Sequence, residues 1–138
     1  YMVRVIMGVK GTGKTKQMIE LINAAAQNES GSVVCIEHNS KLTYDIHYQI
    51  RLVDAKEYSI NNFEMLKGFV SGLHAGNYDI SKVFIESLTK IVGVEAEDPS
   101  VEQFLDWLND FGEKNGINFT VTISADNALA SEGVKKYF

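Results

Sequence analysis

The sequence predicts a three-layer α/β fold, in which a mostly parallel sheet of about five strands carries helices on both faces. Two observations predict it. Short apolar runs alternate along the chain with longer stretches in which apolar residues recur every three or four positions, as on one face of a helix. The first apolar run also leads directly into a glycine-rich turn and then into such a periodic stretch. We interpret residues 2–138 as a single domain, because this length is typical of one compact unit.

Five segments have the composition of strands. Residues 3–7 are mostly apolar and predict a strand buried on both faces. Residues 33–36 and 83–85 are apolar throughout, and each run is followed by a glutamate. Residues 49–54 and 118–124 alternate between two kinds of side chain, and we expect the first of these two segments to be a peripheral strand.

The periodic stretches predict the helices. Residues 14–27 predict the first helix, and four of its apolar residues share one face. These are Met18, Leu21, Ile22 and Ala25. The second helix begins after Asn61 or Asn62, both of which can cap a helix, and runs to about residue 75. Gly76 is expected just past its end.

The last part of the chain predicts one long helix and two less regular segments. The long helix is capped either by Asp98 or by Ser100 within a capping box, and Gly116 ends it. Residues 89–98 are expected to be an acidic loop, and residues 125–138 to contain one short helix.

Four of the predicted strands end in residues that suit a binding site. These residues are Gly8, Glu37, Glu86 and Ser124. Because ligands of parallel α/β sheets bind beyond the carboxyl ends of the strands, we expect these four positions to lie along one edge of the sheet.

Composition excludes several classes of function. The net charge of −5 disfavours tight binding of nucleic acids, whose phosphates are also negative. No apolar run is long enough to span a membrane, and no signal peptide opens the chain. The lone cysteine, Cys35, lies in an apolar run and is expected to be buried. We therefore expect a cytoplasmic protein in a reducing compartment.

Residues 8–15 fit the pattern G-x-x-x-x-G-K-S/T at every fixed position, between a predicted strand and a predicted helix. Glycines let such a loop wrap a polyphosphate, backbone amides supply hydrogen-bond donors, and Lys14 adds a positive charge. The Thr15 hydroxyl is a ligand for Mg²⁺. The pattern predicts a P-loop, or Walker A motif, that binds a nucleotide through Gly8, Val9, Lys10, Gly11, Thr12, Gly13, Lys14, Thr15 and Lys16.

Glu86 follows the apolar run at residues 83–85, as an acidic residue does in a Walker B element. We expect Glu86 and Thr15 together to hold Mg²⁺. An aspartate is more usual at this position, and glutamate is one methylene longer.

With these motifs the chain resembles the RecA-like branch of P-loop NTPases over residues 3–126. The resemblance implies that Glu37 orients or deprotonates the attacking water, with His38 as a second candidate, and that Lys14 and Glu37 are the catalytic residues. It also implies that Ser124, at the end of a later strand, is a sensor of the nucleotide.

The arginines depart from what a hydrolase of this branch needs. Arg4 and Arg51 are the only two in the chain, and neither is expected near the phosphates. A second copy of the chain or a partner protein would then supply a cation, in the form of an arginine or a lysine. The branch also has a further strand beyond the P-loop strand, so here that strand is expected at the sheet edge, where a partner or a covering tail would protect it.

Three functions stay open. The sequence favours Mg²⁺-dependent ATP binding with slow hydrolysis; ATP is preferred over GTP because no N-K-x-D guanine selector is present. The alternatives are a nucleotide-binding regulatory or assembly module without turnover, and a small phosphotransferase. For the last, residues 39–47, with Lys41 and Tyr44, are the only candidate lid.

Overall fold

The structure, a computed structural model, describes residues 1–39 and 49–138. Its strands form one sheet in the order β1-β5-β4-β2-β3, and every neighbouring pair is parallel. The strands are β1 (Val3–Gly8), β2 (Ser32–Glu37), β3 (Arg51–Asp54), β4 (Ile80–Ile85) and β5 (Asn118–Ser124). The predicted parallel α/β sheet is therefore confirmed, including the peripheral position of β3.

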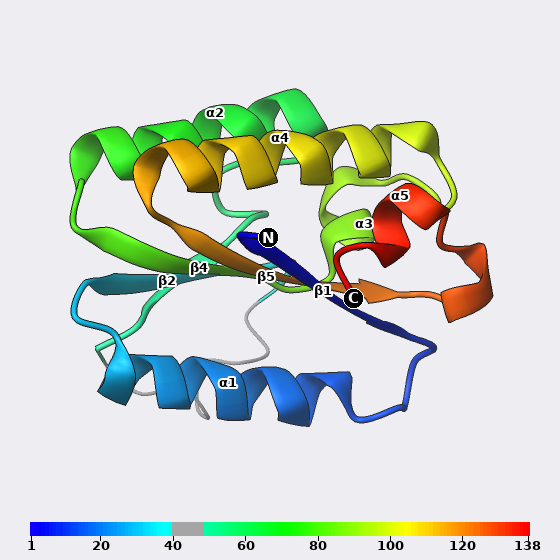
Figure 1. Cartoon of the computed structure of the whole chain (residues 1–138), viewed down its shortest axis with the longest axis horizontal. Coiled ribbons are helices and arrows are strands. Elements are labelled where there is room, and N and C mark those ends of the chain that lie inside the picture. Colours follow the sequence, from blue (N-terminus) through cyan, green and yellow to red (C-terminus); the bar gives the residue numbers. More distant parts are fainter. Residues whose placement is uncertain (40–48) are drawn as a thin grey trace.

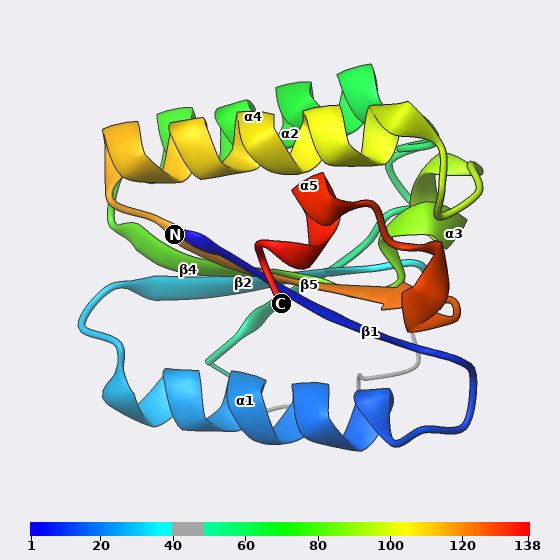
Figure 2. The same ribbon diagram turned by 45° about the vertical axis from the view of Figure 1, so that its right-hand side comes forward.

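Helices cover both faces of the sheet and complete the three layers (Figures 1 and 2). One face is covered by α1 (Lys14–Asn28). The other face is covered by α2 (Phe63–Gly76), α3 (Leu88–Val92), α4 (Pro99–Asn115) and α5 (Glu132–Lys135). Within residues 1–39 and 49–138, no helix is long and apolar enough to cross a membrane.

Side chains that alternate along the strands divide the core in two. The larger part lies between the sheet and the layer of α2, α3, α4 and α5. The smaller part lies under α1 and contains Met18, Ile22, Val33, Cys35, Ile50 and Phe84. Cys35 is fully buried, as expected, and burial raises the pKa of its thiol, with the charges of Glu37 and Glu86 adding to the effect.

The P-loop strand β1 lies at the edge of the sheet, as predicted. The expectation that it is buried on both faces was wrong, because Arg4 is exposed on the α1 side of this edge. A tail covers part of the open edge: the Val5 amide donates to the Tyr137 carbonyl at 2.7 Å. This hydrogen bond lowers the number of unpaired backbone groups that the edge strand exposes.

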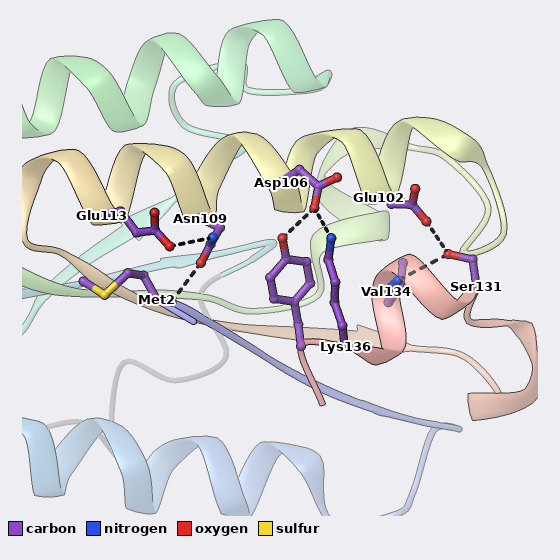
Figure 3. A network of polar contacts seen from close by, with 9 residues as sticks. Met2, Glu102, Asp106, Asn109, Glu113, Ser131, Val134 and Lys136 are labelled. Carbon is purple, nitrogen blue, oxygen red and sulfur yellow. Dashed lines mark hydrogen bonds and ion pairs between the residues drawn. The ribbon is translucent and has the colours of Figure 1, made fainter.

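The tail is fastened to α4 by side chains (Figure 3). Asp106 accepts hydrogen bonds from the Tyr137 hydroxyl and pairs with Lys136 at 3.0 Å. Ser131 donates to Glu102 at 2.8 Å, and its own hydroxyl caps α5. The segment from residue 125 contains a 3₁₀ turn, η1 (Asn127–Leu129), in addition to the one short helix that was expected.

Capping residues fix where the helices begin and end. The Asn62 side chain accepts from the Met65 amide and caps α2, while Gly76 is the last helical residue and does not follow the helix. Of the two alternatives for α4, Asp98 is the cap, and Gly116 closes the helix at φ 69°. Residues 89–98 are only partly a loop, because α3 occupies their start.

Candidate functional site

The loop between β1 and α1 has a backbone that requires glycine. Gly11 and Gly13 have φ values of 89° and 83°, in the left-handed region that side chains with a Cβ rarely adopt. At Gly8 the obstacle is space, since an added Cβ would lie 2.8 Å from Thr12 Oγ1. The geometry of this turn therefore explains the two fixed glycines of the motif, Gly8 and Gly13, and also the glycine at position 11.

Two side chains of the loop donate hydrogen bonds to one backbone carbonyl of the same loop, that of Val9. Thr12 Oγ1 donates to the Val9 carbonyl at 2.8 Å, and Lys14 Nζ donates to the same oxygen at 2.9 Å. Gly13 precedes α1, and its carbonyl accepts the amide of Gln17. The amides at the start of α1 have no partner of their own within the helix, and its first turn contains no acidic residue. This end of α1 therefore attracts anions.

A cavity of about 270 Å³ lies beside the loop at the carboxyl edge of the sheet. Its lining consists of Lys10, Gly11, Gly13, Lys14, Thr15, Glu86, Ser87, Lys90 and Ser124. The structure thus brings the two expected Mg²⁺ ligands, the expected sensor and the P-loop lysine to one place. Burial lowers the pKa of Lys14, the Lys90 charge lowers it further, and Glu86 opposes them.

The carboxylate of Glu86 is held in a defined position at the end of β4. Ser87 Oγ donates to Glu86 Oε1 at 2.6 Å, and the Ser87 amide donates to Thr122 Oγ1 on β5 at 2.8 Å. Ser87 has φ 60°, a left-handed conformation that is uncommon outside glycine and that turns the chain directly into α3. Strained backbone of this kind is concentrated at functional sites.

Glu37 lies next to Glu86 but not in the cavity lining. Ile36 pairs with Ile85, so the residues that follow them, Glu37 and Glu86, end neighbouring strands. Both continue the face that packs under α1, since Cys35 and Phe84 belong to that core. Glu37 is 2% exposed, and among the described residues the cavity includes Glu86 and Ser124 but not Glu37. Its catalytic role stays a prediction.

The donor set of the cavity fits Mg²⁺. This ion binds proteins through one or two oxygen side chains and takes its other ligands from water and phosphate. Thr15 provides a hydroxyl and Glu86 a carboxylate on the same cavity. In the described part of the chain, no group of three or more His, Cys, Asp or Glu side chains could hold a metal ion by itself, without ligands from water and phosphate.

A second cavity, of about 420 Å³, lies on the other side of the loop. Gly8, Val9 and Thr12 border it together with Asp126 and Asn127, which follow β5. Val9 is 50% exposed there. The predicted contact residue Lys16 projects from the first turn of α1 with an exposed side chain.

Sequence reasoning missed Lys90 and the role of Ser87. Both lie in the stretch after β4, where a five-residue helix is too short to show a helical period, and Lys90 falls in the segment that was expected to be an acidic loop. The signal that was present is the apolar pattern of Leu88, Ile91 and Val92, three buried residues on one face of α3. The candidate lid at residues 39–47 falls outside the described residues except for residue 39.

Comparison with known proteins supports the fold. No family model matches the chain, and no curated protein matches its sequence. Among solved structures, the chain resembles the flagellar accessory protein FlaH from Methanocaldococcus jannaschii, with a TM-score of 0.59 and 13% sequence identity. The likeness covers 97% of this chain but 65% of the FlaH chain, so this chain spans slightly less than two-thirds of that protein. At this identity the likeness shows the fold alone, and it agrees with the parallel α/β sheet described above.

Proposed function

We propose that the chain binds ATP with Mg²⁺ in the cavity beside the P-loop. The observation that supports this most directly is the meeting of Lys14, Thr15 and Glu86 on one cavity, next to a loop whose glycines take left-handed conformations. A polyphosphate needs amide donors, a cation and a metal-binding oxygen pair; Lys14, Thr15 and Glu86 supply the last two on this cavity, and the loop and the start of α1 beside it carry the amides.

Each group has a separate task in this proposal. Amides of the loop and of the start of α1 bind the phosphate oxygens, while Lys14 leaves the Val9 carbonyl to reach them. Thr15 and Glu86 hold Mg²⁺, which when bound neutralises charge on the phosphates. Ser87 keeps the Glu86 carboxylate in place through its hydrogen bond. Glu37, buried at the end of β2, is proposed to accept the proton of an attacking water.

Titration of the purified chain with ATP and Mg²⁺ in a calorimeter tests the proposal. Lys14→Ala is expected to weaken ATP binding by at least tenfold, since a charged hydrogen-bond partner contributes about 1.5–3 kcal/mol. Lys114→Ala is the matched control, because Lys114 is exposed in the last turn of α4. That turn leads into the amino-terminal end of β5, whereas the cavity lies at the carboxyl ends of the strands. Equal affinity of the Lys14 variant and the wild type would refute the proposed role of the loop.

A nucleotide-binding module without turnover is a second candidate, and two observations favour it. Glu37 is not part of the described cavity lining. The Arg51 side chain is bonded to the Leu52 carbonyl and the Tyr58 hydroxyl, and Arg4 is on β1 far from its carboxyl end. Release of phosphate by the wild type, abolished in Glu37→Gln with ATP binding retained, favours the hydrolase. Binding without any phosphate release favours the module.

A further inference from the structure

Lys90 has a fixed place on the nucleotide cavity. The backbone turns into α3 at Ser87, whose carbonyl accepts the amides of Lys90 and Ile91, both at 3.1 Å. Leu88, Ile91 and Val92 anchor α3 in the core. Lys90 lies on the opposite side of this short helix, is exposed, and lines the cavity beside the P-loop.

Lys90 lines the same cavity as the two residues proposed to hold Mg²⁺. In P-loop proteins the Mg²⁺ ion bridges the β- and γ-phosphates and is held by the loop hydroxyl and an acidic residue. Here those two residues are Thr15 and Glu86, and both line the cavity together with Lys90. Lys90 is four residues beyond Glu86, at the far end of the turn that Ser87 makes.

Two lysines of the cavity, Lys14 and Lys90, repel one another. Among the described residues, its lining contains three lysines, Lys10, Lys14 and Lys90, and one carboxylate, that of Glu86. The Lys90 charge contributes to the lowered pKa of Lys14, as expected of two nearby cations. A ligand with several negative charges relieves this repulsion. The relief grows with the negative charge that the ligand places beside Lys14 and Lys90.

We propose that Lys90 binds the terminal phosphate of ATP, so that the chain itself supplies the cation that its two arginines do not. The proposal rests on the proposed function and adds to it a residue that distinguishes a triphosphate from a diphosphate. It also replaces the expectation that a second copy or a partner protein must provide this charge.

The test compares a non-hydrolysable ATP analogue with ADP, each titrated with Mg²⁺ into the wild type, Lys90→Met, Lys90→Arg and Lys114→Met. Lys90→Met is expected to weaken binding of the ATP analogue about tenfold and to change ADP binding less than about twofold, because ADP lacks the phosphate that Lys90 contacts. Lys90→Arg keeps the charge and is expected to retain the preference for the triphosphate. Lys114→Met is expected to match the wild type.

The outcomes separate this inference from the function on which it rests. If the wild type and Lys114→Met bind the ATP analogue and Lys90→Met binds it equally well, the role of Lys90 is refuted and the nucleotide site stands. Equal weakening for the ATP analogue and ADP also refutes it, since Lys90 would then act on a phosphate common to both. If the wild type binds neither ligand, both proposals fail. Because Lys90 is exposed, thermal melts are expected to show that all variants fold.

Discussion

Gly13 serves both the backbone conformation of the loop and the space of the cavity. Its φ of 83° places it in the left-handed region, and it also lines the cavity proposed for the phosphates. A side chain at this position would both strain the backbone and project from the loop where a ligand is expected to bind. The stability of the loop and its binding are therefore linked through one glycine.

Gly13→Ala is expected to lower the free energy of unfolding by about 1–2 kcal/mol, the strain of a Cβ in this conformation, and to weaken ATP binding. Gly68→Ala is the matched control, because Gly68 lies inside α2 with no atom within 4 Å of an added Cβ. That change is expected to stabilise the chain by about 0.5–1 kcal/mol and to leave ATP binding unchanged. Urea denaturation and calorimetric titration measure both effects, and a stable Gly13 variant with full affinity would contradict the role of this glycine.

At this scale the sequence allowed some site residues to be predicted and not others. Lys14 and Thr15 were predicted from a pattern with fixed spacing and Glu86 from its place after an apolar strand, and the structure places all three on one cavity. Lys90 belongs to no such pattern. An exposed lysine in a short segment is indistinguishable in sequence from any solvated lysine, and its position on the cavity depends on the turn at Ser87.

Among the elements, the segment after β5 shows how local structure is joined to the rest of the fold. Tyr137 accepts the Val5 amide from β1, while its hydroxyl and Lys136 both reach Asp106 on α4 (Figure 3). Burial acts to raise the pKa of Asp106, but hydrogen bonds from Tyr137 and Lys136, with the Lys136 charge, outweigh it. The pKa of Asp106 therefore lies below its ordinary value of 3.8.

Because this pKa is lowered on folding, the contribution of Asp106 to stability is present above pH 3.8 and is lost as the pH falls through the folded-state value. Asp106→Asn is expected to destabilise the chain by about 0.5–1 kcal/mol at pH 7, a small effect because the side chain is partly solvated. The difference from the wild type should shrink below pH 3.8. Urea denaturation at several pH values measures it, with the exposed Asp110→Asn as control; a difference independent of pH would contradict this account.

The long elements were predictable, whereas of the short helices only one, within residues 125–138, was expected and α3 was not. The helices α1, α2 and α4 contain several turns of apolar periodicity, and α2 and α4 also have side-chain caps, Asn62 and Asp98, that were among the expected capping residues. By contrast, α3 has five residues and α5 has four, fewer than a period-based argument needs. Contacts with the rest of the fold, not local sequence, decide such short helices.

For the molecule as a whole, parallel strands determine where the site lies. Every strand pair is parallel, so β1, β4 and β5 present their carboxyl ends at one edge. The loop after β1, the acid after β4 and Ser124 at the end of β5 meet there, although they are far apart in sequence. This arrangement was predictable because it follows from the alternation of strands and helices. The details of the cavity lining could not be predicted, because they depend on side-chain packing.

Binding at this edge is expected to stabilise the whole chain. With ATP and Mg²⁺ at about 100 times the dissociation constant, the free energy of unfolding should rise by about 2.7 kcal/mol. For a domain of this size the melting temperature should rise by roughly 5–10 °C. Differential scanning calorimetry measures the shift, which should fall on removal of Mg²⁺ with EDTA and be absent in Lys14→Ala. A shift of the same size in that variant would show that the stabilisation comes from another site.

The closure of the β1 edge by Tyr137 offers a way to follow this site one amide at a time. The Val5 amide is protected from solvent by a hydrogen bond to a residue more than a hundred positions away, and β1 continues from Val5 directly into the loop proposed to bind phosphate. Deuterium uptake at Val5 therefore reports whether the tail is in place. Uptake in the loop beyond Gly8 is expected to report occupancy of the proposed nucleotide site, and one exchange experiment with overlapping short peptides follows both segments.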